Sequence, residues 1–147
     1  MKSGTIFAVL LGTLTLAALP SAPAAQDTLV HPAPPGANPL IEEMLLLDKT
    51  FREVVSGVAV GDAERVSAAL EAMHGAMEKT REGVRAGKVT IPKNAHRVRE
   101  FLRLDRKFHG GLETLARAAR ADDRRRMLVL TKRLLDECVN CHRMFKR

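Results

Sequence analysis

Apolar residues recur at spacings of three and four through most of this chain, and this spacing restricts the fold more than any other feature. The first series begins after position 38, and three more follow it before the carboxy terminus. Residues with this spacing lie on one face of an α-helix, so each series predicts an amphipathic helix. The first series is Leu40, Met44, Leu47, Phe51, Val54 and Val58.

Capping and breaking residues separate the four predicted helices. Asn and Asp favour the N-cap, Pro favours the first helical position, and Gly favours the residue after the last turn. The second helix is expected to be continuous up to a glycine, with Met73 and Met77 in the core, and the third is expected over 95–121. The boundary markers are Asn38-Pro39, Gly61-Asp62, Gly87, and Asp122 or Asp123.

Four amphipathic helices joined by short connections predict an all-α fold, an antiparallel four-helix bundle over residues 39–147. The chain has 147 residues, enough for one domain, and it contains no Trp or Tyr. Its core must therefore consist mainly of Leu, Val, Ala and Met.

The amino-terminal residues predict export. Lys2 precedes an uncharged apolar run of about 15 residues, shorter than a membrane-spanning helix needs. Ala22-Pro23-Ala24 fits a signal-peptidase site, so residues 1–24 are interpreted as a signal peptide and 25–38 as a proline-rich extended lead-in containing His31. The expected location is a periplasm, where thiols are normally oxidised or bonded. The alternative is an uncleaved membrane anchor.

Both cysteines of the chain stand in one motif near its end, Cys138-Val139-Asn140-Cys141-His142. At these spacings in a helix, Cys138, Cys141 and His142 share a face on or beside the apolar stripe. Two thiols three residues apart can add to the two vinyl groups of one haem, while the following imidazole binds the iron. The pattern C-x-x-C-H is accordingly typical of covalent haem c attachment.

Other interpretations of the motif account for less of it. A structural zinc site needs four ligands, and no second Cys or His pair stands at suitable spacing. A thioredoxin-like site would lie in a βαβ context, which this sequence lacks. A disulfide within one helical turn is geometrically unfavourable and leaves His142 without a role.

An exported four-helix bundle with C-x-x-C-H on its last helix resembles the class II cytochromes c, the family of the cytochromes c′ and their low-spin relatives. The resemblance rests on motif position and helix number over 39–147. It implies that Cys138 and Cys141 form the thioethers and that His142 is the proximal iron ligand. Phe145 matches an aromatic of the family's haem environment, whereas Lys146 replaces its arginine.

The resemblance also places the distal residue early on the first helix, at Met44 or, with a shift of one position, at Leu45. Methionine ligation implies a low-spin electron carrier that carries out no bond-making chemistry. A non-ligating residue implies a five-coordinate haem that binds NO or CO. Met44 packed simply in the core is the alternative to both. Family members also form helix-paired homodimers.

The remaining histidines and the charged residues are weaker indications of function than the C-x-x-C-H motif. His74 and His109 flank their stripes and are interpreted as satisfied boundary residues rather than iron ligands, and His96 as solvated. The net charge is +7, and the predicted fourth helix is strongly basic. It is expected to steer an acidic redox partner, or else simply to form a solvated outer face. Nucleic-acid binding is disfavoured by export and by the lack of a recognition motif.

Overall fold

The computed structural model describes residues 38–146. The predicted signal peptide, its cleavage site and all of the lead-in except Asn38 lie outside the described residues, as does Arg147. Within the described part of the chain, no helix combines the length and the apolar character needed to cross a membrane.

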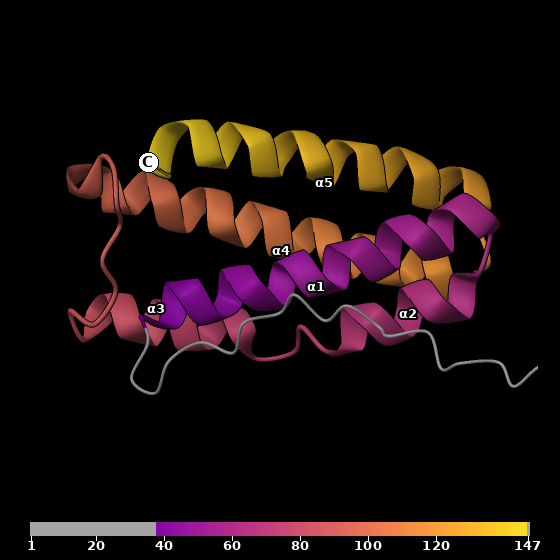
Figure 1. Ribbon diagram of the computed structural model, residues 1–147, viewed down its shortest axis with the longest axis horizontal. Coiled ribbons are helices and arrows are strands. Elements are labelled where there is room, and N and C mark those ends of the chain that lie inside the picture. Colours follow the sequence, from indigo (N-terminus) through magenta and orange to yellow (C-terminus); the bar gives the residue numbers. More distant parts are fainter. Residues whose placement is uncertain (1–37, 147) are drawn as a thin grey trace, which may run out of the picture.

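The described residues are helical and contain no strand, which confirms the predicted all-α class. The elements are α1 (Pro39–Val60), α2 (Ala63–Glu71), α3 (Ala76–Arg85), η1 (Ala95–Arg97), α4 (Val98–Arg120) and α5 (Arg124–Phe145). The helices form four rods, made by α1, by α2 with α3, by α4 and by α5. The rods lie side by side along one long axis, and consecutive rods run in opposite directions (Figure 1). The second rod consists of two helices, and a single 3₁₀ turn precedes the third.

The predicted caps form hydrogen bonds to otherwise unpaired amides of the first helical turns. The side chain of Asn38 accepts from the amide of Leu40 at 3.0 Å. Asp62 and Asp123 do the same at the starts of α2 and α5, each at 2.9 Å. Gly61 ends α1 with a φ of 74°, a conformation that glycine adopts without the steric cost of a Cβ. The helix boundaries therefore follow from local chemistry.

The second rod differs from the prediction, because it is broken at 72–75 rather than continuous. Gly75 has a φ of 78° and starts α3 in the left-handed region. After the break, Ala76 and Thr80 are buried, while Met77 is only half-buried. Met73 lies in the core as predicted.

Two apolar clusters fill the bundle. The larger one joins α1, α2, α4 and α5, and includes Val54, Val66, Leu115, Met127 and Leu134. The smaller one contains Leu40, Ile91, Phe101 and Phe145, and lies where α5 ends. Cys141 packs against this smaller cluster, which places the predicted motif at that end of the bundle.

Gly110 and Gly111 do not interrupt α4. A Cβ added to Gly111 would lie 2.8 Å from Cδ2 of Leu134, which is buried on α5. The absence of a side chain at Gly111 therefore lets α4 and α5 approach closely. A Cβ at Gly110 would meet nothing within 4 Å.

Candidate functional site

Both cysteines lie on the inward stripe of α5, as the spacing predicts. The stripe runs from Met127 and Leu134, both buried, to Phe145, which is also buried. Cys138 and Cys141 are free thiols and half-buried, whereas His142 is exposed. The two thiols are thus held at the edge of the core, with the imidazole beside them on the accessible side.

The residues around Cys141 form an apolar environment drawn from three parts of the chain. Phe101 of α4 and Phe145 of α5 meet edge to face, with ring centroids 5.5 Å apart. Met44 of α1 packs, like Cys141, against the smaller cluster to which these rings belong. A residue of the first helix and a thiol of the last helix, 97 positions apart, therefore border the same apolar cluster.

The last turn of α5 is fixed by the connector between α3 and α4. Asn94 Nδ2 donates to the Met144 carbonyl at 2.7 Å, and Lys93 Nζ donates to the Arg143 carbonyl at 3.1 Å. The amide of Lys93 donates to the Phe145 carbonyl at 3.2 Å. These bonds satisfy carbonyls that have no partner within the helix and hold the turn that carries Cys141 and His142. The apolar spacing does not predict this role of Asn94 and Lys93, because neither residue belongs to a helical stripe.

The environment keeps the thiols and the imidazole in their neutral forms near pH 7. Burial raises the pKa of the Cys138 thiol to about 11, with Cys141 and Glu137 adding to the shift. Burial also raises the pKa of Cys141, and the charge of Asp105 acts in the same direction. Burial lowers the pKa of His142, and Lys146 lowers it further. A neutral imidazole is the form that binds a metal ion.

The buried face of α1 includes a polar residue next to Met44. The sequence predicts Met44 on the inward stripe, but the buried line of α1 runs through Leu40, Glu43, Thr50 and Val54. Met44 is half-buried beside this line. Glu43, a polar residue that the apolar spacing omits, occupies the fully buried position of this turn, while Met44 packs against the smaller cluster.

The histidines separate into one buried residue and several exposed ones. His109 is buried rather than at the boundary, and its Nε2 lies 2.5 Å from Oε1 of Glu43. His74 is exposed and its Nδ1 lies 2.9 Å from Oε2 of Glu71. His96 is exposed in η1, as expected. His31 lies outside the described residues.

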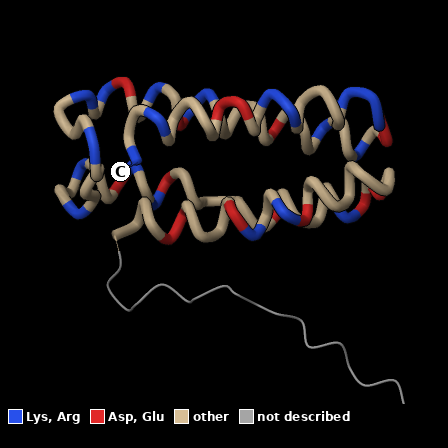
Figure 2. The backbone as a smooth tube through the Cα atoms, turned by 45° about the horizontal axis from the view of Figure 1, so that its top comes forward, with Lys and Arg blue, Asp and Glu red and all other residues tan. Residues whose placement is uncertain are grey.

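The basic residues of α5 are exposed, as predicted, and α4 also carries exposed basic residues. Figure 2 shows how basic residues are distributed along the rods. Acidic residues are interspersed along the rods, and one of them binds across the two helices. Glu137, next to Cys138, lies 2.9 Å from Nζ of Lys107 on α4. The exposed basic residues of α5 and its C-cap are Arg124, Arg125, Arg126, Lys132, Arg133, Arg143 and Lys146.

Two surface hollows lie away from the motif. One is bordered by Phe51, Val55 and their neighbours on the outer face of α1. The other lies between α4 and the break in the second rod, with Gly75, Glu78 and His109 among its lining residues. Neither hollow is bordered by Cys138, Cys141 or His142.

Comparison of the chain with protein-family models, with curated proteins and with solved structures gave no match. The function must therefore be inferred from the site itself.

Proposed function

We propose that the protein is an exported monohaem c-type cytochrome of the class II kind, built as an antiparallel four-helix bundle, and that it acts in electron transfer. The observation that carries the proposal is the arrangement of Cys138, Cys141 and His142 on the last turns of α5. Both thiols are free and half-buried, and Cys141 packs against the smaller apolar cluster. The imidazole follows directly and favours its neutral form. This donor set fits covalent haem attachment.

In the proposal, Cys138 and Cys141 hold the haem through thioether bonds and His142 is the proximal ligand. The haem iron supplies one-electron redox chemistry when bound. Phe101 and Phe145 form an apolar wall that limits water access, and a low-polarity environment raises the reduction potential of a haem. The capping bonds from Asn94 and Lys93 hold the ligand-bearing turn in one orientation.

Met44 is the proposed distal ligand. Its support is that Met44 and Cys141 pack against the same cluster. A thioether ligand opposite His142 would complete a low-spin, six-coordinate site, which suits an electron carrier because no position is left for a substrate.

One observation favours a second candidate function. Glu43, rather than Met44, occupies the fully buried position of this turn, and Met44 is only half-buried. If Met44 does not coordinate the iron, the haem is five-coordinate and suited to binding NO or CO.

The exposed basic residues of α5 support an acidic redox partner. Because they lie on the helix that carries the motif, an acidic surface attracted to them would dock close to the haem. Long-range attraction of this kind weakens as ionic strength rises.

The absorption spectrum of the purified protein tests the two candidate functions. An electron carrier should show a low-spin ferric spectrum with the long-wavelength methionine–iron charge-transfer band, and should bind CO slowly after reduction. Met44→Ala should abolish the band and make CO binding fast, whereas the control Met77→Ala, at a half-buried methionine of α3, should change neither. A high-spin spectrum that Met44→Ala leaves unchanged would establish the gas-binding alternative instead.

A further inference from the structure

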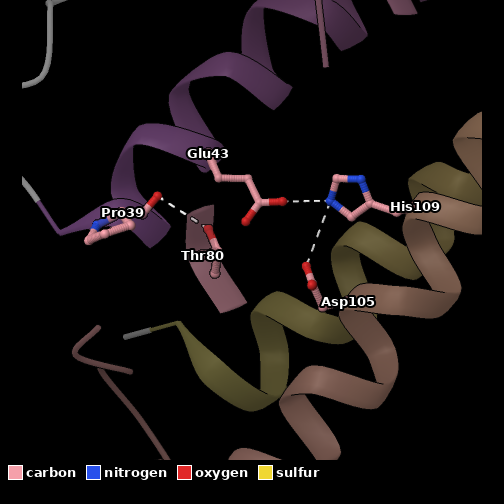
Figure 3. Close-up of polar contacts among 5 residues, drawn as sticks. All are labelled: Pro39, Glu43, Thr80, Asp105 and His109. Atoms are coloured by element: carbon pink, nitrogen blue, oxygen red, sulfur yellow. Dashed lines mark hydrogen bonds and ion pairs between the residues drawn. The ribbon is translucent and has the colours of Figure 1, made fainter. Parts of the chain in front are cut away.

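A second group of chemically active side chains lies inside the bundle, between α1 and α4. Glu43 projects from α1 towards Asp105 and His109, which stand one turn apart on α4 (Figure 3). Oε1 of Glu43 lies 2.5 Å from Nε2 of His109, and Oδ1 of Asp105 lies 3.8 Å from the same nitrogen. One ligand atom of each residue lies within 4.8 Å of those of the other two. Two carboxylates thus converge on one imidazole nitrogen.

The described residues do not supply a hydrogen bond to every carboxylate oxygen of this cluster. The side chain of Glu43 is 1% exposed, yet within residues 38–146 its Oε2 has no hydrogen-bond partner, and Oδ2 of Asp105 has none either. Nε2 of His109 carries at most one proton, so it cannot donate to both carboxylates. Buried carboxylate oxygens without a partner are costly in free energy and are rare in folded proteins. The cluster therefore leaves two buried carboxylate oxygens that a bound cation would pair.

The charge and the ligand types together define the missing group. A metal ion displaces the proton of His109, and the two carboxylates and the neutral imidazole then carry a charge of about −2, which one divalent cation balances. Calcium and magnesium prefer sites made entirely of oxygen ligands. An imidazole combined with carboxylates suits zinc, manganese or iron in the divalent state. Three protein ligands leave further coordination positions for water.

A cation can reach the cluster from solvent. His109 lines the surface hollow between α4 and the break in the second rod, together with Gly75 and Glu78. Because α2 ends before α3 begins, the imidazole is accessible there, although most of its side chain is buried. The lining of this opening carries the carboxylates of Glu71, Glu78 and Glu113 as well as the guanidinium groups of Arg117 and Arg120.

We propose that Glu43, Asp105 and His109 form a binding site for one divalent transition-metal ion, separate from Cys138, Cys141 and His142. The ion joins α1 to α4 and pairs the two buried carboxylates. The site uses none of the residues assigned to haem attachment, so it does not depend on the proposed function.

Isothermal titration with zinc chloride, and separately with manganese chloride, tests the site on the full chain after dialysis against a chelator. The Cys138→Ser/Cys141→Ser variant serves as the background, because it removes thiolate ligands and covalent haem together. One equivalent of metal should bind. Glu43→Gln and Asp105→Asn, which keep the side-chain shape, should each weaken binding by at least about tenfold, because each removes a direct ligand.

The matched control is His74→Gln, which removes the exposed histidine that is paired with Glu71. It should leave the affinity unchanged. Equal affinity in the background, Glu43→Gln and Asp105→Asn proteins would overturn the proposal, as would an absence of binding to the background protein.

Cobalt absorption gives a second measurement that needs no ligand variant. Addition of Co²⁺ to the background protein should produce d–d bands that differ from those of aqueous cobalt, because nitrogen and oxygen ligands replace water. The spectrum of aqueous cobalt, unchanged by the protein, would contradict the site even if the ligand variants failed to fold.

Discussion

Glu43 and His109 connect α1 to α4 inside the bundle, with 2.5 Å between Oε1 and Nε2. Burial alone would lower the pKa of His109, but the hydrogen bond to Glu43 and the charges of Glu43, Asp105 and Glu78 raise it overall. Asp105, one turn earlier, is affected in the same direction. Burial and the charge of Glu43 raise its pKa to about 6, against the opposing effects of His109 and Arg81.

The raised pKa of Asp105 predicts a loss of stability as pH rises. The folded state binds this proton more tightly than the unfolded state, whose ordinary pKa is 3.8. The contribution is therefore complete below pH 3.8 and is lost as pH rises through about 6. In metal-free protein, Asp105→Asn should raise the free energy of unfolding at pH 8 by about 1–3 kcal/mol and change it little at pH 4. Urea unfolding at both values measures this.

Asp136→Asn is the control for that prediction, since Asp136 is exposed on α5. It should leave the difference in stability between pH 4 and pH 8 as it is in the original protein. If Asp105→Asn gave the same free energy of unfolding as the original protein at pH 8, the buried carboxylate would not carry the expected cost.

The two adjacent glycines of α4 should respond oppositely to alanine. Gly111→Ala places a Cβ 2.8 Å from Leu134 in the packed contact with α5, so it should lower the free energy of unfolding by about 1–3 kcal/mol. Gly110→Ala meets nothing within 4 Å and should raise it by about 0.5–1 kcal/mol through helix propensity. Thermal unfolding of the two variants measures both. Equal shifts of the same sign would contradict the close approach of α4 and α5.

Asn94 should stabilise the last turn of α5. Asn94→Ala removes the hydrogen bond to the Met144 carbonyl. It also places alanine at a φ of 55°, in the left-handed region that alanine tolerates less well than asparagine. The free energy of unfolding should fall by about 1–2 kcal/mol, and amide exchange should accelerate in that turn. Asn94→Gly relieves the backbone strain but not the lost bond, so it separates the two effects. Exchange at the rate of the original protein in both variants would show that the connector does not hold the turn.

Helix boundaries could be predicted from the sequence because caps act locally. Asn38, Asp62 and Asp123 each bond to an amide two or three residues ahead. The break before α3 was missed because the apolar spacing continues through it, and Gly75 alone does not distinguish a tolerated helical glycine from a left-handed one. Its conformation depends on how α2 and α3 pack against the other rods.

The thiol positions of the candidate site could be predicted for the same local reason, since Cys138 and Cys141 follow the stripe of α5. The Glu43–Asp105–His109 cluster could not be predicted by counting apolar residues alone. A signal was nevertheless present. Glu43 stands three residues after Leu40, and Asp105 and His109 lie between Phe101 and Leu112 at helical spacing. Polar residues on the buried face of a helix indicate either a hydrogen-bonded network or a ligand-binding site.

The intact mass of the protein, purified after export and measured under denaturing conditions, tests the central claim most directly. The account predicts the mass of the polypeptide plus one haem, with the red chromophore remaining on the chain during acid–organic extraction. Cys138→Ala/Cys141→Ala should lose both the added mass and the retained colour. A polypeptide that carries no added mass when it is produced in cells that attach haem c to other proteins would contradict the account.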